Sequence, residues 1–126
     1  MKLDLNPILE VEASIINNAG GAEPLVEQIF YILEKNPDGL LRENDVSSEI
    51  WYVKTMNALR NHALAFLVTD SQGKAETNKL EAGTYYICGI SQTHRGFEVW
   101  NVPVDLQPGK NSLVLDHRNM SGNTHS

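Results

Sequence analysis

The first third of the chain has the apolar pattern of β-strands. Residues 8–16, ILEVEASII, are rich in β-branched side chains and predict a strand. Residues 17–24, NNAGGAEP, predict a loop, because Asn and Gly accept positive φ and proline cannot donate to a strand ladder. Residues 25–35, LVEQIFYILEK, could form a helix by composition, but the succession of large apolar residues favours a second strand.

Residues 36–63 predict two helical segments instead. Asn36 is a suitable cap and Pro37 a suitable first residue for the first segment. The second segment, residues 47–63, begins with capping serines and has Glu49 in its first turn, where a negative charge is favourable. Its apolar positions share one stripe, which must be buried against another element: Tyr52, Met56, Leu59 and Ala63, widened by Trp51 and Thr55. The opposite face is polar: Lys54, Asn57 and Arg60.

After residue 63 the pattern returns to strands separated by tight turns that contain Gly or Pro. The predicted strands are residues 64–69, 74–80, 84–90, 97–106 and 111–117. Short strands at such intervals indicate a β-sandwich. We therefore expect a mainly β, single-domain sandwich over residues 8–117 with a helical insertion at 36–63. Residues 118–126, RNMSGNTHS, are polar and predict a frayed tail.

Composition excludes several classes of function. A chain of 126 residues, 41% hydrophobic and 21% charged, suits one globular domain. Its net charge of −6 disfavours general nucleic-acid binding and binding to an anionic membrane surface. The N-terminus, MKLDLNPILE, lacks the apolar core of a signal peptide, and no apolar run is long enough to span a membrane. We expect no nucleic-acid partner and no membrane insertion. Either the protein stays inside the cell, or its export signal is not part of this sequence.

Four short motifs occur in order along the predicted strands. They are GAEPL, TDSQGK, LEAGTYYICGI and VPVDLQPGKNSLVLD. Together they resemble the carboxypeptidase regulatory-like domains of the transthyretin-like, or prealbumin-like, β-sandwiches, over most of residues 11–115. The residues that match the family pattern are Pro24, Leu25, Thr69, Asp70, Gly73, Leu80, Gly83 and Tyr85. The helical stretch 36–63 departs from the pattern, since family members usually have a short connection there.

The resemblance implies a Greek-key sandwich of about seven strands with a non-catalytic binding or structural role. Such domains are commonly exported or attached to larger exported proteins. In the resembling domains the tyrosine of the Gly-x-Tyr motif, which Tyr85 matches here, points between the sheets. Because side chains alternate along a strand, the outer face then receives Tyr86, Cys88 and Ile90. The second strand likewise points Phe30 and Ile32 inward and leaves on the outer face Ile29, Tyr31 and Leu33.

The apolar outer faces of two strands and the apolar stripe of the second helix can be buried against each other. A patch of this size is larger than a monomer usually leaves exposed. We therefore expect the second helix to pack over Tyr31, Leu33, Tyr86 and Cys88. That outer face is then covered by the chain itself and is not a binding site.

One pair of features gives a weak candidate binding cluster. His94-Arg95 and His117-Arg118 both follow predicted strands and could converge as an anion or metal site. The alternative, two solvated loops, is favoured. His62, near a helix end, is expected to interact with the last carbonyls of that helix.

The chain also offers acidic residues for a calcium site and aromatic rings for a sugar platform. Asp70 with Asn78, Glu76 and Glu81 lacks the regular spacing of a calcium loop, so Asp70 is expected to cap its own turn. An aromatic platform for sugar could use Trp51, Tyr52, Trp100 and Tyr86. Trp100 shares strand parity with Val102, Val104 and Leu106, which predicts a core position, and Trp51 belongs to the helix stripe. A platform requires one ring to remain exposed.

Catalysis finds little support. Cys88, the single cysteine, lies among apolar residues that raise a thiol pKa, and no nucleophile elbow, zinc motif or phosphate loop is present. The hydroxyisourate hydrolases share the resembling fold, but their C-terminal Tyr-Arg-Gly-Ser signature is missing. Adhesin-like relatives form a Lys–Asn isopeptide bond, and the first strand here offers no Lys. We expect no catalytic residue, no metal and no cofactor. The expected partner is a protein or a carbohydrate. A carbohydrate-binding module is the first alternative function, and a hydroxyisourate-type hydrolase is the second.

Overall fold

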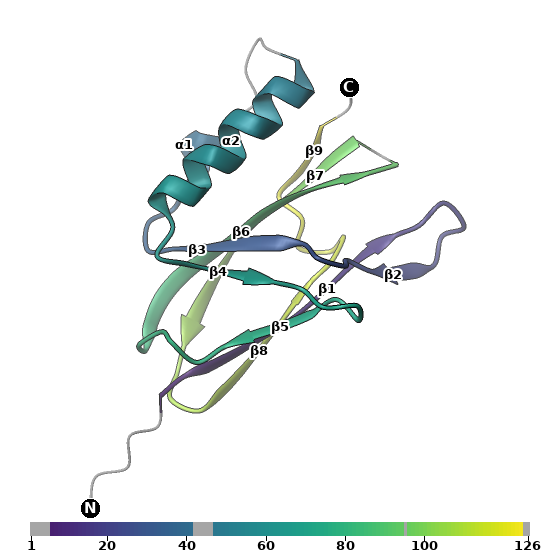
Figure 1. Cartoon of the computed structure of the whole chain (residues 1–126). Coiled ribbons are helices and arrows are strands. Elements are labelled where there is room, and N and C mark those ends of the chain that lie inside the picture. The colour runs from purple at the N-terminus through teal and green to yellow at the C-terminus, as the bar shows by residue number, and fades with distance from the viewer. Residues whose placement is uncertain (1–5, 42–46, 95, 125–126) are drawn as a thin grey trace, which may run out of the picture.

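The computed structural model, which describes residues 6–41, 47–94 and 96–124, contains two β-sheets packed face to face (Figure 1). In one sheet β1 pairs with antiparallel β5 and β2 and with parallel β8. The other sheet has the order β4-β3-β6-β7-β9. The strands are β1 (Ile8–Ile16), β2 (Ala22–Pro24), β3 (Ile29–Leu33), β4 (Ala65–Val68), β5 (Lys74–Thr77), β6 (Gly83–Thr93), β7 (Gly96–Leu106), β8 (Lys110–Leu115) and β9 (Gly122–Thr124). The expected mainly β sandwich with two sheets is confirmed.

Two strands of three residues each lie where the sequence predicts none. β2 falls in the predicted loop 17–24 and forms a hairpin with the end of β1. The Asn17 side chain organises the connection, because its Oδ1 accepts bonds of 3.0 Å from the N–H groups of Ala19 and Gly21. Pro24 is tolerated since it lies on an edge strand.

The predicted frayed tail from residue 118 is wrong for its described part. The chain turns after β8, and β9 then pairs with residues 97–99 of β7. Ser121 fixes this return, because its N–H donates to the Val99 carbonyl at 2.6 Å and its Oγ accepts from the Asn101 N–H at 2.9 Å. Backbone bonds of this kind leave no hydrophobic pattern in the sequence.

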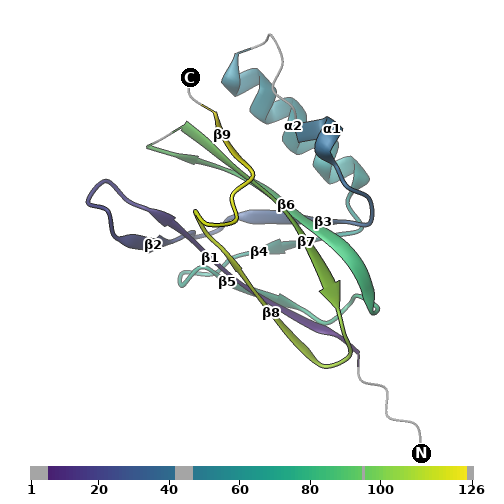
Figure 2. The same ribbon diagram turned by 180° about the vertical axis from the view of Figure 1, so that it is seen from behind.

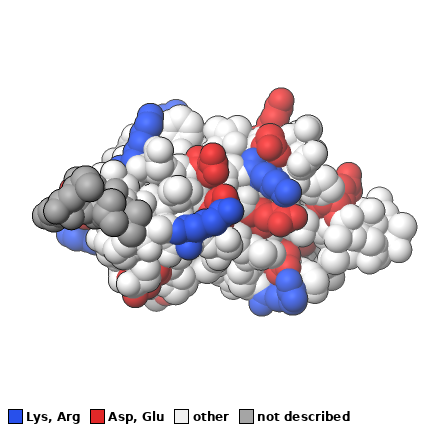
Figure 3. All heavy atoms as spheres, turned by 90° about the horizontal axis from the view of Figure 1, so that it is seen from below, with Lys and Arg blue, Asp and Glu red and all other residues white. Residues whose placement is uncertain are grey.

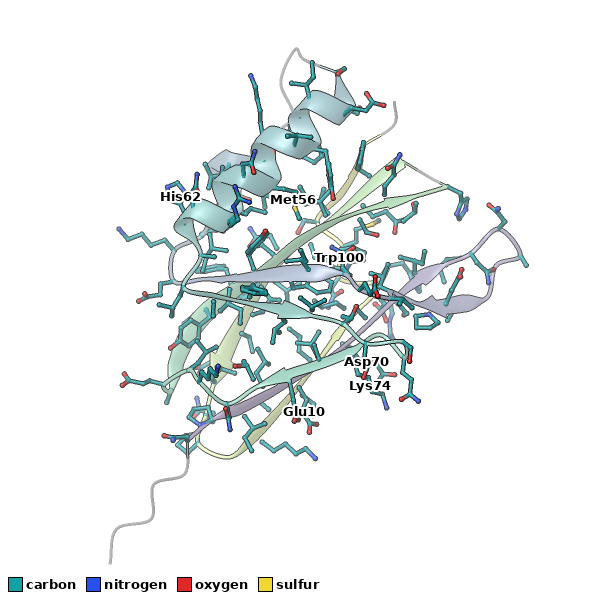
Figure 4. All side chains as sticks on the ribbon, in the orientation of Figure 1. Glu10, Met56, His62, Asp70, Lys74 and Trp100 are labelled. Carbon is teal, nitrogen blue, oxygen red and sulfur yellow. The ribbon has the colours of Figure 1, made fainter. Side chains whose placement is uncertain are left out.

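The core between the sheets is built around Trp100. This side chain is fully buried, and its ring meets Phe30 edge-on with the centroids 6.0 Å apart. Its Nε1–H donates to the Asp116 carbonyl at 2.9 Å, which satisfies the one polar group of the ring. Figure 4 shows Trp100 between the two sheets. The predicted core position of Trp100 is confirmed, as are the inward positions of Tyr85, Ile87, Phe30 and Ile32.

Helices α1 (Asp38–Leu41) and α2 (Ser48–His62) form the predicted insertion, and α2 lies across the outer face of the β3-β6-β7 region (Figures 1 and 2). Leu59 packs with Tyr31, Leu33 and Cys88, and partly buried Met56 and Tyr86 join the same cluster. Nearer the start of α2, Trp51 packs with Ile90, Phe97 and Val99. The outer face is therefore covered by α2, as the strand parity predicts. No helix in the described ranges is long and apolar enough to cross a membrane.

Candidate binding surfaces

The four residues of the predicted weak cluster have separate surroundings. His94 is exposed at the β6–β7 hairpin, and Arg95 lies outside the described residues. The Arg118 guanidinium is bound to Asp116, with Nη2 to Oδ2 at 2.7 Å, and this bond holds the Asp116 pKa below its usual value. No hydrogen bond or ion pair in the described part of the chain joins His94 to His117 or Arg118. Convergence of the four residues remains a prediction.

Asp70 has the role expected from its position before a glycine turn. Its Oδ1 accepts hydrogen bonds from the N–H groups of Gln72 at 2.8 Å and Lys74 at 3.0 Å. These backbone bonds, first that of Lys74, lower the pKa of the carboxyl group. Figure 4 shows Asp70 and Lys74 together at the β4–β5 turn. Asp70 therefore caps its own turn, and the described residues contain no group of three or more His, Cys, Asp or Glu arranged to hold a metal.

The aromatic residues considered for a sugar platform do not form one. Trp51 and Trp100 are buried, and the partly buried Tyr52 ring stacks on Phe97 with centroids 4.9 Å apart. Phe66 of β4, which was not among the candidates, is 63% exposed. The exposed ring thus lies on β4, outside the set of aromatic residues that the sequence suggested for a platform.

An exposed apolar strip follows one side of β4. Leu64, Phe66 and Val68 are 53%, 63% and 47% exposed, whereas the intervening Leu67 points into the core. We call these three residues the β4 strip. Helix α2 covers the neighbouring part of the same sheet but leaves the β4 strip open.

The main chain of β4 is also open along its outer edge up to Val68; beyond it the Asp70 N–H donates to the Lys74 carbonyl at 2.8 Å, where the chain turns into β5. β4 is the first strand in its sheet order, and β3 is its one partner among the described strands. The Thr69 N–H donates to the Gln28 carbonyl at 3.0 Å, so the hydrogen-bonded pairs with β3 fall at Thr69 and Leu67. At the start of the strand the Leu64 N–H also faces β3 and donates to the Ile32 carbonyl at 2.8 Å. The N–H and C=O groups of Phe66 and Val68 therefore point away from β3, toward the free edge.

This edge lacks the charges that usually keep strand edges apart. Lysine, glutamate or proline on an edge strand prevents pairing with other chains. β5 has Lys74 and Glu76, and β2 has Glu23 and Pro24, but the sequence from Leu64 to Thr69 is uncharged. Open hydrogen-bonding groups and apolar side chains together make β4 suitable for strand addition.

A groove of about 580 Å³ continues from the Leu64 end of the strip. It lies where β3 leaves for α1 and where α2 returns to β4. Its lining residues are Leu33, Glu34, Lys35, Asn36, Pro37, Gly39, Leu40, His62, Ala63 and Leu64. His62 Nδ1 lies 2.8 Å from the Ala58 carbonyl, which confirms the predicted contact with the end of its own helix. A chain lying along β4 would extend into this groove.

The outer face of the β5-β1-β8 sheet is different in character. Charged side chains of both signs are interspersed over the side of the molecule seen in Figure 3. A second groove of about 510 Å³ crosses this sheet, and Glu12, Lys74, Glu76 and Ser112 are among its lining residues. Beside it, Lys110 Nζ lies 3.3 Å from Glu10 Oε1. This arrangement is typical of a solvated sheet face.

Cys88 is expected to resist thiol reagents in the native state. The side chain is fully buried beneath α2, its Sγ lies 3.5 Å from Asn101 Oδ1, and burial raises the thiol pKa to about 12. Since the thiolate is the reactive form, its fraction at neutral pH is roughly a thousandfold smaller than for a thiol of pKa 9.0. Labelling with an aromatic disulfide reagent should proceed only as the protein unfolds. Rapid labelling without denaturant would contradict this placement.

Comparison with known proteins addresses the fold. No family model matches the chain, and no curated protein sequence matches it. Among solved structures, the chain is similar to a candidate carbohydrate-binding protein from Pseudomonas aeruginosa, with a TM-score of 0.59 and 11% identity over 91% of each chain. The likeness is to a β-sandwich.

Two surface-fibre proteins have the same kind of domain. The minor pilin GBS52 of Streptococcus agalactiae has a TM-score of 0.53 and 15% identity, covering 87% of this chain and 43% of the pilin. The fimbrial protein FimP of Actinomyces oris has a TM-score of 0.51 and 11% identity, covering 90% of this chain and 30% of FimP. The chain thus spans less than half of either protein. Identities this low establish the fold alone.

Proposed function

We propose that this chain is a non-catalytic binding module whose β4 edge docks an extended polypeptide segment. The observation that carries the proposal is the β4 strip on an uncharged free edge. Added strands gain affinity from main-chain hydrogen bonds and specificity from alternate side chains. Here Phe66 and Val68 supply both the open main-chain groups and the exposed apolar side chains.

The chemistry of the strip favours a polypeptide over a sugar. Sugar hydroxyl groups need hydrogen-bonding side chains around an aromatic ring, because desolvated hydroxyls without partners are costly. Leu64 and Val68, which flank Phe66 on the strip, have none. An alternating apolar segment of protein would bury these side chains and pair the main chain at the same time.

Carbohydrate binding is the second candidate, and the groove over β1, β5 and β8 would be its site. Carboxylate, ammonium and hydroxyl groups line that groove and could bind sugar hydroxyls. The similar structure from P. aeruginosa is of a candidate carbohydrate-binding protein, a likeness of fold. A hydroxyisourate-type hydrolase is the weakest candidate, because the Tyr-Arg-Gly-Ser signature is missing and the Arg118 guanidinium is bound to Asp116.

The proposal also includes membership of the carboxypeptidase regulatory-like domains and a place in an exported protein. Contacts within the resembling motifs support the first part: Thr69 Oγ1 donates to the Leu25 carbonyl at 2.5 Å, and the Tyr85 hydroxyl donates to the Glu81 carbonyl at 2.9 Å. The pilus and fimbrial proteins of similar fold support export.

Selection from a phage library of random twelve-residue peptides tests the docking proposal. We expect enrichment of peptides with alternating apolar residues, and we expect Phe66→Lys to weaken their binding at least tenfold, since a buried Phe side chain contributes about 1.5–3 kcal/mol. Val114→Lys is the matched comparison on the other sheet, because Val114 is 45% exposed on β8 and lines the second groove, so this change should leave docking at β4 unaltered and weaken only ligands bound in that groove.

The same proteins distinguish the alternatives. Peptides that bind wild type and the Val114 variant, but not the Phe66 variant, support docking at β4. Equal binding to all three proteins would place the peptides elsewhere and overturn the proposal. Binding on a glycan array together with no selected peptide would favour the carbohydrate candidate.

A further inference from the structure

We infer that the segment docked on β4 is β4 of a second copy of this chain, so that two sandwiches join across a two-fold axis. This inference rests on the proposed docking function and names its partner. A two-fold interface requires a surface that is complementary to itself. The β4 edge meets this requirement because it is apolar and uncharged, so that pairing brings no like charges together along the strand.

The register follows from which main-chain groups are open. An antiparallel pair exchanges two hydrogen bonds wherever hydrogen-bonded residues lie opposite one another. The open groups on β4 belong to Phe66 and Val68. Placing Phe66 opposite Val68 of the second copy, with the axis near Leu67, makes two such pairs and four hydrogen bonds. It also sets an aromatic ring against a β-branched side chain, a favourable cross-strand pair.

Charges at the two ends of β4 fit an antiparallel arrangement. Beyond Val68 lie exposed Glu27, whose N–H donates to the Thr69 carbonyl at 3.0 Å, and exposed Asp70. At the other end, exposed Lys35 and His62 line the groove beside Leu64, together with exposed Glu34 at its β3 side. Antiparallel pairing brings the acidic end of each copy to the end with Lys35 and His62 of the other, whereas parallel pairing would place like ends together.

The groove beside Leu64 then also has an occupant. In this register, position 70 of the second copy lies opposite Leu64. The turn from Asp70 to Gly73 of that copy therefore reaches the groove of about 580 Å³, in which Lys35 can face the Asp70 carboxylate. The main chain, the apolar strip and the groove are used together in one contact.

Sedimentation velocity across a dilution series tests the inference. We expect wild type to dimerise and Phe66→Lys to weaken the dimer by at least about 100-fold, because each dimer contains the change twice. Val114→Lys should dimerise as wild type does. Lys35→Glu should weaken the dimer and Lys54→Glu, an equal charge change on the exposed side of α2, should not. Circular dichroism melts should show all four variants folded.

Hydrogen exchange supplies a second measurement. Dimerisation should slow exchange at the amides of Phe66 and Val68, which are open in the monomer. A chain that stays monomeric at every concentration overturns the inference, as does a dimer that Phe66→Lys leaves intact. Peptide binding at β4 by a strictly monomeric chain would remove the second copy as partner and leave the docking function standing. A monomer that also binds no peptide would remove both.

Discussion

Leu59→Ala is expected to lower the free energy of unfolding by about 2–5 kcal/mol, the range for truncating a fully buried leucine. Leu59 has no exposed surface, and it packs between Tyr31, Leu33 and Cys88 under α2. The substitution removes the side chain that joins the helix to the two strands and leaves a cavity there. Denaturant unfolding followed by circular dichroism measures the change.

Lys54→Ala is the matched control on the exposed side of the same helix. It should change the free energy of unfolding by no more than about 0.5 kcal/mol, as surface substitutions usually do. If α2 were instead a mobile lid over a ligand groove, its apolar side would be partly wet and Leu59→Ala would cost little. A near-neutral Leu59→Ala beside a costly Lys54→Ala would show that the helix faces the other way.

Strand parity explains why the covered face could be predicted. Once Tyr85 points inward, alternation places Tyr86 and Cys88 on the outer face, and the only unmatched apolar stripe in the sequence belongs to residues 47–63. The position of α2 follows from the need to bury both surfaces. Core assignments such as Trp100 follow from the same alternation.

The β4 strip shows where this reasoning stops. Residues 64–69, LAFLVT, have apolar side chains at both parities, as the second strand does, so the sequence cannot say which set stays open. That depends on the path of α2, which covers β3 and leaves Phe66 exposed. Applying parity to this strand, with Leu67 inward, would have placed Leu64, Phe66 and Val68 outside. β2 and β9 cannot be predicted for another reason, because three-residue strands held by backbone bonds leave no apolar period.

Gly73→Ala is expected to destabilise the sandwich by roughly 2–6 kcal/mol, the sum of backbone strain and overpacking. Gly73 has φ of 76°, a conformation that favours glycine. A Cβ there would collide with the Ala13 carbonyl oxygen and would lie 3.1 Å from Pro24 Cβ. The Gly73 carbonyl also accepts the Ala13 N–H at 2.8 Å, so the turn cannot move away without breaking its bond to β1.

Gly20→Ala separates the two causes. Gly20 has a similar φ of 86°, but a Cβ at that position would have no neighbour within 4 Å. Its substitution should therefore cost only the backbone strain, about 1–3 kcal/mol. Thermal and denaturant unfolding of the two variants should differ by the energy of the collision with β1. If the two variants lose the same free energy of unfolding, β1 and the β4–β5 turn can separate freely. The close approach of Gly73 to Ala13 would then not explain why the turn has a glycine at this position.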